Sequence, residues 1–125
     1  MSLLYPSLGC FNPDTFTVYG RLQYNGAGVP TLIKGKGVKS ITDDGAGLFT
    51  VEVDHPWSHM LQAGGHRESV AAVGGGVQFI KGTDVVATRK LSYRIIGDAD
   101  AVEDPANGDG CSFFAVLQKS GLPAV

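Results

Sequence analysis

The stretch Gly35–Val53 constrains the fold more than any other part of the chain. A polar run leads into the turn residues Asp43–Gly47, and an apolar and aromatic run, Leu48–Val53, follows. Every second residue of that last run is apolar, and these residues are Phe49, Val51 and Val53. A repeat of two is typical of a strand with one buried face. The stretch is therefore predicted to form a β-hairpin, and it carries no catalytic group.

Glycine is the unusual feature of the composition, with 18 residues in a chain of 125. The glycines are spread between short strand-like runs, as in proteins with many tight turns, because Gly reaches positive φ at little steric cost. These runs are Thr15–Tyr24, Ser69–Val73, Val77–Ile80, Asp84–Thr88, Lys90–Ile96 and Ser112–Gln118. An apolar fraction of 43% argues against intrinsic disorder.

Two of these runs carry more specific information. In Thr15–Tyr24, Gly20 interrupts the inward-facing apolar set, which predicts a bulge or a close backbone approach. Ser112–Gln118 is apolar on both sides. It is therefore predicted to lie in the middle of a sandwich or against a partner subunit.

The stretch Asp54–Gly65 is predicted to be the one short helix, with Pro56 at its first position and Gly64 at its end. No alternation of strands and helices indicates a parallel sheet. We therefore expect an all-β fold, an antiparallel jelly-roll-like sandwich with one short helix. An N-terminal arm over residues 1–14 would precede a single domain over residues 15–125.

The charge distribution argues against several classes of partner. Net charge is −2, and the segment Gly97–Gly110 carries five Asp and Glu residues without a cation. No basic face predicts nucleic acid binding. No apolar run is long enough for a membrane helix, and the N-terminus lacks the basic region of a signal peptide. We expect no membrane association and synthesis in a cytoplasm.

The two cysteines leave two alternatives open. Cys10 and Cys111 flank the first and last strand-like runs, so a disulfide is compatible with a sheet in which the termini meet. Free thiols are favoured, because a domain of this size needs no disulfide.

Motifs that carry chemistry are not found. His55 and His59 would share one face of a helix, but no Cys or Glu nearby completes a zinc site. The acidic segment lacks the ligand and Gly positions of a calcium loop, so a solvated loop is favoured over a cation site. No P-loop, nucleophile elbow or zinc-protease motif occurs. We expect no enzyme and no cofactor.

The best candidates for binding a partner are uncharged. The N-terminal arm carries the apolar residues Leu3, Leu4, Tyr5, Leu8 and Phe11. Exposed apolar clusters are costly unless covered, so the arm either binds a partner or folds back on its own domain. Trp57, the single tryptophan, is predicted to fill a core edge or an interface.

The hairpin also resembles a known pattern. Gly35–Thr42 followed by Gly45–Val53 is similar to a motif of small bacteriophage virion proteins with C1q/TNF-like jelly-roll domains. Val18–Leu22 resembles the strand that often precedes it, and Asp104–Gly108 with Phe113–Leu117 resembles the final loop and closing strand. The apolar arm and the Pro56-Trp57 segment depart from this family.

The resemblance implies a homotrimer without catalytic residues. We expect a virion structural protein that decorates or cements the capsid and binds the major capsid protein, with main-chain pairing by an arm or edge strand. A receptor- or glycan-binding tip domain of a tail fibre is the alternative, and Trp57, Tyr93 or Tyr24 around a groove would favour it. A cell-wall-binding module has only the acidic segment in its favour.

Overall fold

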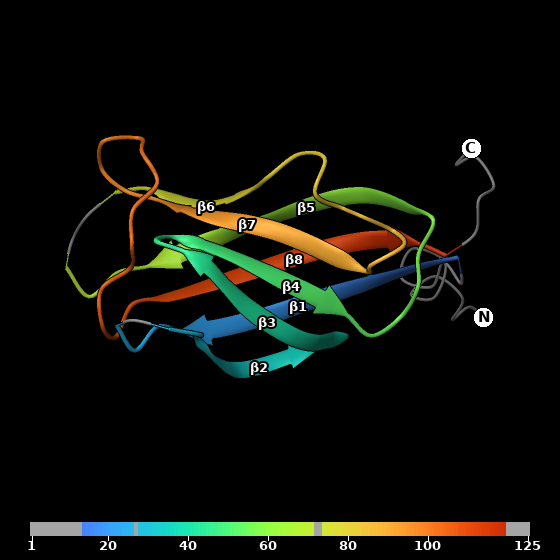
Figure 1. Ribbon diagram of the computed structural model, residues 1–125, viewed down its shortest axis with the longest axis horizontal. Coiled ribbons are helices and arrows are strands. Elements are labelled where there is room, and N and C mark those ends of the chain that lie inside the picture. Colours follow the sequence, from blue (N-terminus) through green and yellow to red (C-terminus); the bar gives the residue numbers. More distant parts are fainter. Residues whose placement is uncertain (1–13, 27, 72–73, 120–125) are drawn as a thin grey trace, which may run out of the picture.

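The protein forms a sandwich of two antiparallel sheets (Figure 1). The computed structural model describes residues 14–26, 28–71 and 74–119. The strands of this part are β1 (Thr15–Gln23), β2 (Thr31–Lys36), β3 (Val38–Gly45), β4 (Leu48–Val53), β5 (His59–Glu68), β6 (Gly76–Phe79), β7 (Lys90–Ile96) and β8 (Gly110–Gln118). One sheet has the order β2-β1-β8-β5, and the other has the order β3-β4-β7-β6. The expected all-β antiparallel sandwich is confirmed.

The chain passes repeatedly from one sheet to the other. In the described part it changes sheets between β2 and β3, β4 and β5, β5 and β6, and β7 and β8. The first and last of these strands, β1 and β8, pair along their whole length, from Thr15↔Gln118 to Gln23↔Gly110, and lie side by side in Figure 1. This connectivity makes the sandwich jelly-roll-like. It also confirms that the last strand lies in the middle of a sheet, between β1 and β5.

The hairpin forms as the alternation predicts. In β4 the inward residues Phe49, Val51 and Val53 are buried, and β3 pairs with β4 from Val38 to Gly45. The predicted outgoing strand is divided, however. Gly37, at φ +79°, separates β2 from β3, which belong to different sheets. A Cβ at Gly37 would lie 2.5 Å from Val18 Cγ1, so the chain changes sheets where only glycine fits.

Aromatic rings fill the centre of the core. The Phe49 and Tyr93 rings stack with centroids 5.5 Å apart, and Phe113 lies 5.2 Å from Tyr93. Such pairs contribute about 0.5–1.5 kcal/mol each beyond the area they bury. Gly20 makes room for this cluster, since a Cβ there would lie 2.7 Å from the Phe113 ring. The group that approaches Gly20 is this side chain and not the predicted backbone, and the irregular register between β1 and β2 lies at Arg21 and Leu22.

The predicted helix over Asp54–Gly65 is wrong. Residues 54–58 form an irregular connection, and the rest of the stretch belongs to β5, which pairs with β8 from His59↔Gln118 to Glu68↔Gly110. The apolar strand β8 needs a partner on each edge, and this pairing outweighs the local helix signals. Gly65 lies inside β5, where a Cβ would come within 2.3 Å of Ser112 O. The glycines that resembled a helix end are sites of close packing between strands.

Two shorter predicted strands are also wrong. Asp84–Thr88 forms a turn with a single bridge, Val85↔Lys90, and Thr88 N–H donates to Val85 O. Ser69–Ala71 is a bend in which Ala71 N–H donates to Ser69 Oγ at 3.3 Å, and residues 72–73 lie outside the described part. Side-chain and turn hydrogen bonds replace strand pairing in both segments.

The predicted boundary of the arm falls where the described residues begin. Asp14 O accepts a hydrogen bond from Lys119 N–H at 2.7 Å, so Asp14 already belongs to the β1–β8 ladder. Residues 1–13 of the predicted arm lie outside the described part. Across the described ranges, no helix has the length and apolar character needed to cross a membrane.

Candidate partner-binding groove and sheet face

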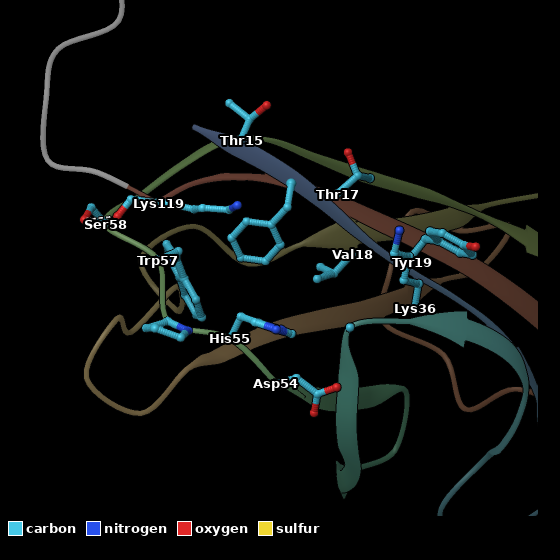
Figure 2. A pocket seen from close by; sticks show the side chains of 13 residues that line it. Thr15, Thr17, Val18, Tyr19, Lys36, Asp54, His55, Trp57, Ser58 and Lys119 are labelled. Carbon is cyan, nitrogen blue, oxygen red and sulfur yellow. Dashed lines mark hydrogen bonds between the residues drawn. The ribbon is translucent and has the colours of Figure 1, made fainter. Parts of the chain in front are cut away.

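A groove of about 890 Å³ runs along the first half of β1 (Figure 2). Its walls are Thr15–Tyr19 of β1, the β2–β3 corner at Lys36 and Gly37, the connection Asp54–Ser58, and Lys119. Successive side chains of a strand point to opposite faces. Consecutive residues of one strand therefore line a groove together only along the edge of that strand. We call this site the β1 groove.

The connection Asp54–Ser58 is fixed at both ends. Asp54 N–H donates to Gly37 O at 2.8 Å, and Ser58 N–H donates to Gln118 O at 2.7 Å. Ser58 Oγ also donates to Lys119 O at 2.9 Å. The wall opposite β1 is therefore held in place by main-chain bonds to the β2–β3 corner and to β8.

Trp57 is the one predicted contact residue within the described part, and it lines the β1 groove. Its side chain belongs to the core and is 2% exposed, which confirms the prediction that it fills a core edge. Figure 2 shows Trp57 and His55 on the connection facing β1, from which Val18 projects. The Trp57 indole N–H is buried, and no acceptor from the described residues lies within hydrogen-bonding distance of it. An unsatisfied buried donor costs about 1–3 kcal/mol.

The rim of the groove combines aromatic and cationic groups. The Phe16 ring contacts the His55 ring edge-on with centroids 6.0 Å apart, and Lys119 Nζ lies 5.9 Å from the Phe16 centroid. Lys36 and Asp54 also line the groove, and they carry opposite charges. The rim therefore carries charges of both signs beside the Phe16 ring.

The other predicted contact residues, Leu3, Leu4, Tyr5, Leu8 and Phe11, lie outside the described residues. Of the aromatic residues expected around a glycan groove, Tyr24 and Tyr93 belong to the core at 6% and 0% exposure. Trp57 alone of that set lines a groove, and its buried ring has no open face for stacking on a sugar.

A second candidate surface lies on the outer face of the β2-β1-β8-β5 sheet. Tyr19 of β1 pairs with Phe114 of β8, which pairs with Gly64 of β5, and all three face away from the core. Tyr19 is 44% exposed, and Phe114 and its neighbour Val116 are half-buried. A Cβ at Gly64 would lie 3.0 Å from the Phe114 ring, so the glycine lets this ring rest on β5. We call Tyr19, Phe114 and Val116 the outer ridge.

The two histidines considered for a zinc site are not on a helix. His55 lies in the connection, and His59 is the first residue of β5. Within residues 14–26, 28–71 and 74–119, no three His, Cys, Asp or Glu side chains are arranged to hold a metal ion.

The acidic segment between β7 and β8 is not simply solvated. Arg67 of β5 reaches it, with Nη1 lying 2.7 Å from Glu103 Oε2 and Nη2 lying 2.9 Å from Asp109 Oδ2. The Asp109 side chain is 1% exposed. Burial alone would raise the pKa of Asp109, but hydrogen bonds from Val70, Arg67 and Ala106 hold it below its ordinary value. Sequence reasoning missed this pair because the residues are far apart in the chain.

Buried groups elsewhere are inert. Cys111 carries a free, buried thiol, in agreement with the favoured alternative, and its Sγ lies 3.7 Å from the Tyr24 hydroxyl. Burial raises the pKa of the Cys111 thiol to about 12 and raises the pKa of the Tyr24 hydroxyl above its usual value. Neither group is a nucleophile at neutral pH.

Comparisons with known proteins found no relative of this chain. No family model, curated protein or solved structure matches it. The β1 groove and the outer ridge are therefore the features of the molecule that bear on its function.

Proposed function

We propose that this chain is a bacteriophage virion structural protein, a homotrimer that binds the major capsid protein and stabilises the assembled head. The jelly-roll-like sandwich supports this proposal, since it presents two large sheet faces and short connections for assembly. The hairpin that resembles virion proteins is part of the same fold. The proposed location is the capsid surface, after synthesis in the host cytoplasm.

The outer ridge is the observation that carries the proposal. An antiparallel sheet with one solvated face normally has polar residues on that face. Here the central strands β1 and β8 place Tyr19, Phe114 and Val116 there. Three copies that turn these ridges toward a shared axis would bury them. Residues at the ridge ends are polar, with Thr17 beside Val116 and Ser112 opposite Arg21.

Stabilisation of a capsid would follow from mass action. A protein that binds the assembled lattice and not the free coat subunit stabilises the lattice by an amount that grows with its concentration relative to Kd. No covalent step is needed. The same trimer contacts several coat subunits at once, which raises its effective affinity.

The mass of the protein in solution tests the trimer. We expect light scattering to give three times the chain mass of 13.1 kDa at micromolar concentration. Phe114→Glu would place a charge in the ridge and should shift the mass to that of a monomer. Val86→Glu is the matched control, because Val86 is 43% exposed in the turn between β6 and β7. A wild-type chain that stays monomeric at all concentrations would overturn the trimer.

Binding to heads tests the role of the trimer. We expect the wild-type protein and Val86→Glu to co-sediment with mature heads of the encoding phage and to raise their melting temperature. Phe114→Glu should do neither. Heads that melt at the same temperature with saturating wild-type protein would contradict the cement role.

A receptor- or glycan-binding tip domain of a tail fibre is the second candidate, and the size of the β1 groove favours it. About 890 Å³ lies within the range of small-ligand sites. The buried ring of Trp57 weighs against a sugar platform. Specific binding on a glycan array that is lost in His55→Ala, at the groove wall away from the outer ridge, would favour the fibre tip over the capsid protein.

A further inference from the structure

We propose that β5 pairs edge to edge with β5 of a second copy of the chain, in an antiparallel register centred on Gly65. We call the side of β5 away from β8 the β5 edge. The contact goes beyond the proposed function, because it uses this edge of the sheet and not the outer ridge on its face.

The main chain of β5 is open to solvent at the middle of the strand. β5 lies at one end of the sheet order, and β8 is the only described strand that pairs with it (Figure 1). Gly65 pairs with the buried Phe113, and a Cβ at Gly65 would lie 3.2 Å from Val77 Cγ1, on the core side. Gly65 is nevertheless exposed. A glycine has no side chain, so the surface that it exposes is backbone that a partner can reach.

The β1–β8 ladder identifies the backbone groups on the β5 edge. Tyr24 N–H donates to Asp109 O at 2.7 Å, so the odd-numbered residues of β8 bond to β1. Successive residues of a strand direct their N–H and C=O groups to opposite edges, so the even-numbered residues of β8 bond to β5. Gly64 pairs with one of these even-numbered residues. Gly64 therefore bonds to β8, and its neighbours Ala63 and Gly65 turn their N–H and C=O groups outward.

The other edge strands carry features that prevent pairing with a neighbour. Charged residues, bulges and short length all protect the edges of sheets. β2 carries two lysines, β3 has two register shifts against β4, and β6 is four residues long. Between His59 and His66, β5 has neither a charged residue nor a proline, and its one register shift lies between Met60 and Gln62. From Gln62 onward, β5 is therefore the least protected edge among the described strands.

The β5 edge is complementary to itself in shape. Pairing centred on Gly65 places Gly65 opposite Gly65 of the second copy, and Ala63 opposite Arg67 of the second copy. Arg67 turns its backbone outward by the same alternation, so these pairs exchange about six main-chain hydrogen bonds. On the outer face, Gly64 lies opposite His66. A small residue thus meets each large one along the shared edge.

The β5 edge also avoids like charges in this register. Its charged residues are Arg67 and Glu68. Arg67 lies opposite Ala63 of the second copy, and Glu68 lies opposite Gln62. Like charges directly opposite each other destabilise a strand pair, and none meet here. The match in size and charge selects a second copy as the occupant of the β5 edge.

One strand pair is a small interface, so the contact is weak in free solution. We expect a dissociation constant of about 0.1–1 mM, well above the micromolar range of the proposed trimer. Neighbouring copies that are bound to one surface have an effective concentration of about 1 mM. On a capsid, the β5 contact would therefore join neighbouring copies into a network.

The solution mass of a Tyr19→Glu chain tests the contact separately from the trimer. This substitution charges the outer ridge on β1, which lies two strands from β5 in the sheet. We expect a monomer at micromolar concentration and a mass that rises toward that of a dimer as the concentration approaches about 1 mM. Sedimentation equilibrium measures both.

Ala63→Pro in the same background removes an outward N–H and leaves the bonds to β8, as proline does on an edge strand. We expect the dissociation constant of the dimer to rise at least about tenfold, since hydrogen bonds across the edge are lost. Ala63→Ser keeps the N–H and should stay within about twofold of the parent chain. Near-UV circular dichroism checks that both variants fold.

Disulfide cross-linking tests the register, even if Ala63→Pro folds poorly. In the proposed register Gln62 and Glu68 of the second copy form a non-hydrogen-bonded pair, with Cα atoms about 4.5 Å apart, which suits a disulfide. In a Cys10→Ser background, a mixture of Gln62→Cys and Glu68→Cys chains should form a cross-linked dimer on mild oxidation. Either variant alone should cross-link at least about tenfold more slowly, because its two cysteines then lie about 20 Å apart.

The outcomes separate the β5 contact from the trimer. Equal cross-linking in the mixture and in the single variants overturns the β5 contact alone, as does a Tyr19→Glu mass that stays at 13.1 kDa up to about 1 mM. Loss of head binding in Ala63→Pro, without self-pairing of the parent chain, assigns the edge to a strand of the coat protein and also overturns it. A wild-type chain that is monomeric at micromolar concentration, but whose mixed cysteine variants cross-link, overturns the trimer and supports the β5 contact.

Discussion

Arg67 and Asp109 form a buried ion pair that ties together two connections between the sheets. Arg67 Nη2 lies 2.9 Å from Asp109 Oδ2, and their side chains are 5% and 1% exposed. The same carboxylate accepts hydrogen bonds from Val70 N–H at 2.9 Å and Ala106 N–H at 3.0 Å. Val70 follows β5 and Ala106 precedes β8. The Asp109 side chain therefore fixes the start of the connection from β5 to β6 and the end of the connection from β7 to β8.

Removing one partner of this pair should destabilise the protein strongly. Arg67→Met leaves the buried Asp109 carboxylate without its cation, which costs about 3–5 kcal/mol. Asp109→Asn should cost less, because Arg67 keeps its ion pair with Glu103. We expect urea unfolding to show a loss of this size in the free energy of unfolding. The slope of the transition should stay unchanged.

The exposed pair Arg21–Glu68 gives the matched control. Its shortest contact is 2.8 Å, but its side chains are 60% and 40% exposed. Arg21→Met should cost about 0–1 kcal/mol, as for surface ion pairs. If Arg21→Met and Arg67→Met lower the free energy of unfolding equally, burial does not determine how much these ion pairs stabilise the protein.

Acid should weaken the fold through the same carboxylate. The pKa of Asp109 is lower in the folded protein than its ordinary value of 3.8. Its contribution to stability is therefore present above pH 3.8 and is lost as the pH falls through the lowered folded value. We expect the melting temperature of the wild type to decrease as the pH is lowered through this range. Asp109→Asn should be less stable than the wild type at pH 7, and its melting temperature should decrease less on acidification. Equal decreases in both proteins would contradict the role of the Asp109 carboxylate in acid sensitivity.

The strands that sequence predicts well are those whose alternation matches burial on one face. Thr15–Tyr24, Leu48–Val53 and Lys90–Ile96 agree with β1, β4 and β7 to within one residue. In each strand the buried side chains are every second residue. Local pattern and tertiary packing act in the same direction there, so one sequence is sufficient to locate them.

The predicted helix was wrong because its signals have a second physical cause. Pro56 and Gly64 suit a helix start and end, yet Pro56 lies in a connection and Gly64 makes room for the Phe114 ring. The pairing of β5 with β8 decides the structure, and β8 lies some fifty residues further along the chain. The β1 groove was equally hidden from sequence, because it depends on where β2 leaves β1. Trp57 was the one residue of that site that its aromatic character identified.

Gly20→Ala should destabilise the core. A Cβ at residue 20 would lie 2.7 Å from the Phe113 ring and 3.2 Å from Leu32 Cδ1, and overpacking of this kind costs about 1–3 kcal/mol. Thermal unfolding measures the loss. Combining Gly20→Ala with Phe113→Leu should cost less than the sum of the two single variants, because the smaller side chain removes the clash.

Gly76→Ala is the control for this argument. A Cβ at Gly76 meets no atom within 4 Å, and Gly76 is not among the residues with positive φ. The substitution should be neutral or should stabilise by about 0.4–1 kcal/mol, since alanine restricts the unfolded chain. An equal loss for both alanine variants would mean that strand propensity, and not the Phe113 ring, makes glycine necessary at residue 20.

Cys111 should resist thiol reagents until the protein unfolds. Burial raises the pKa of its thiol to about 12, above the ordinary value of 9.0. The neutral thiol therefore contributes stability that is fully present below pH 9.0 and is lost as the pH rises through about 12. In a Cys10→Ser background at pH 8, a disulfide reagent should react with native Cys111 at least about a hundredfold more slowly than in urea. If native and unfolded Cys111 react at the same rate, and that rate is proportional to the reagent concentration, the sheet must open at β8 in the native protein.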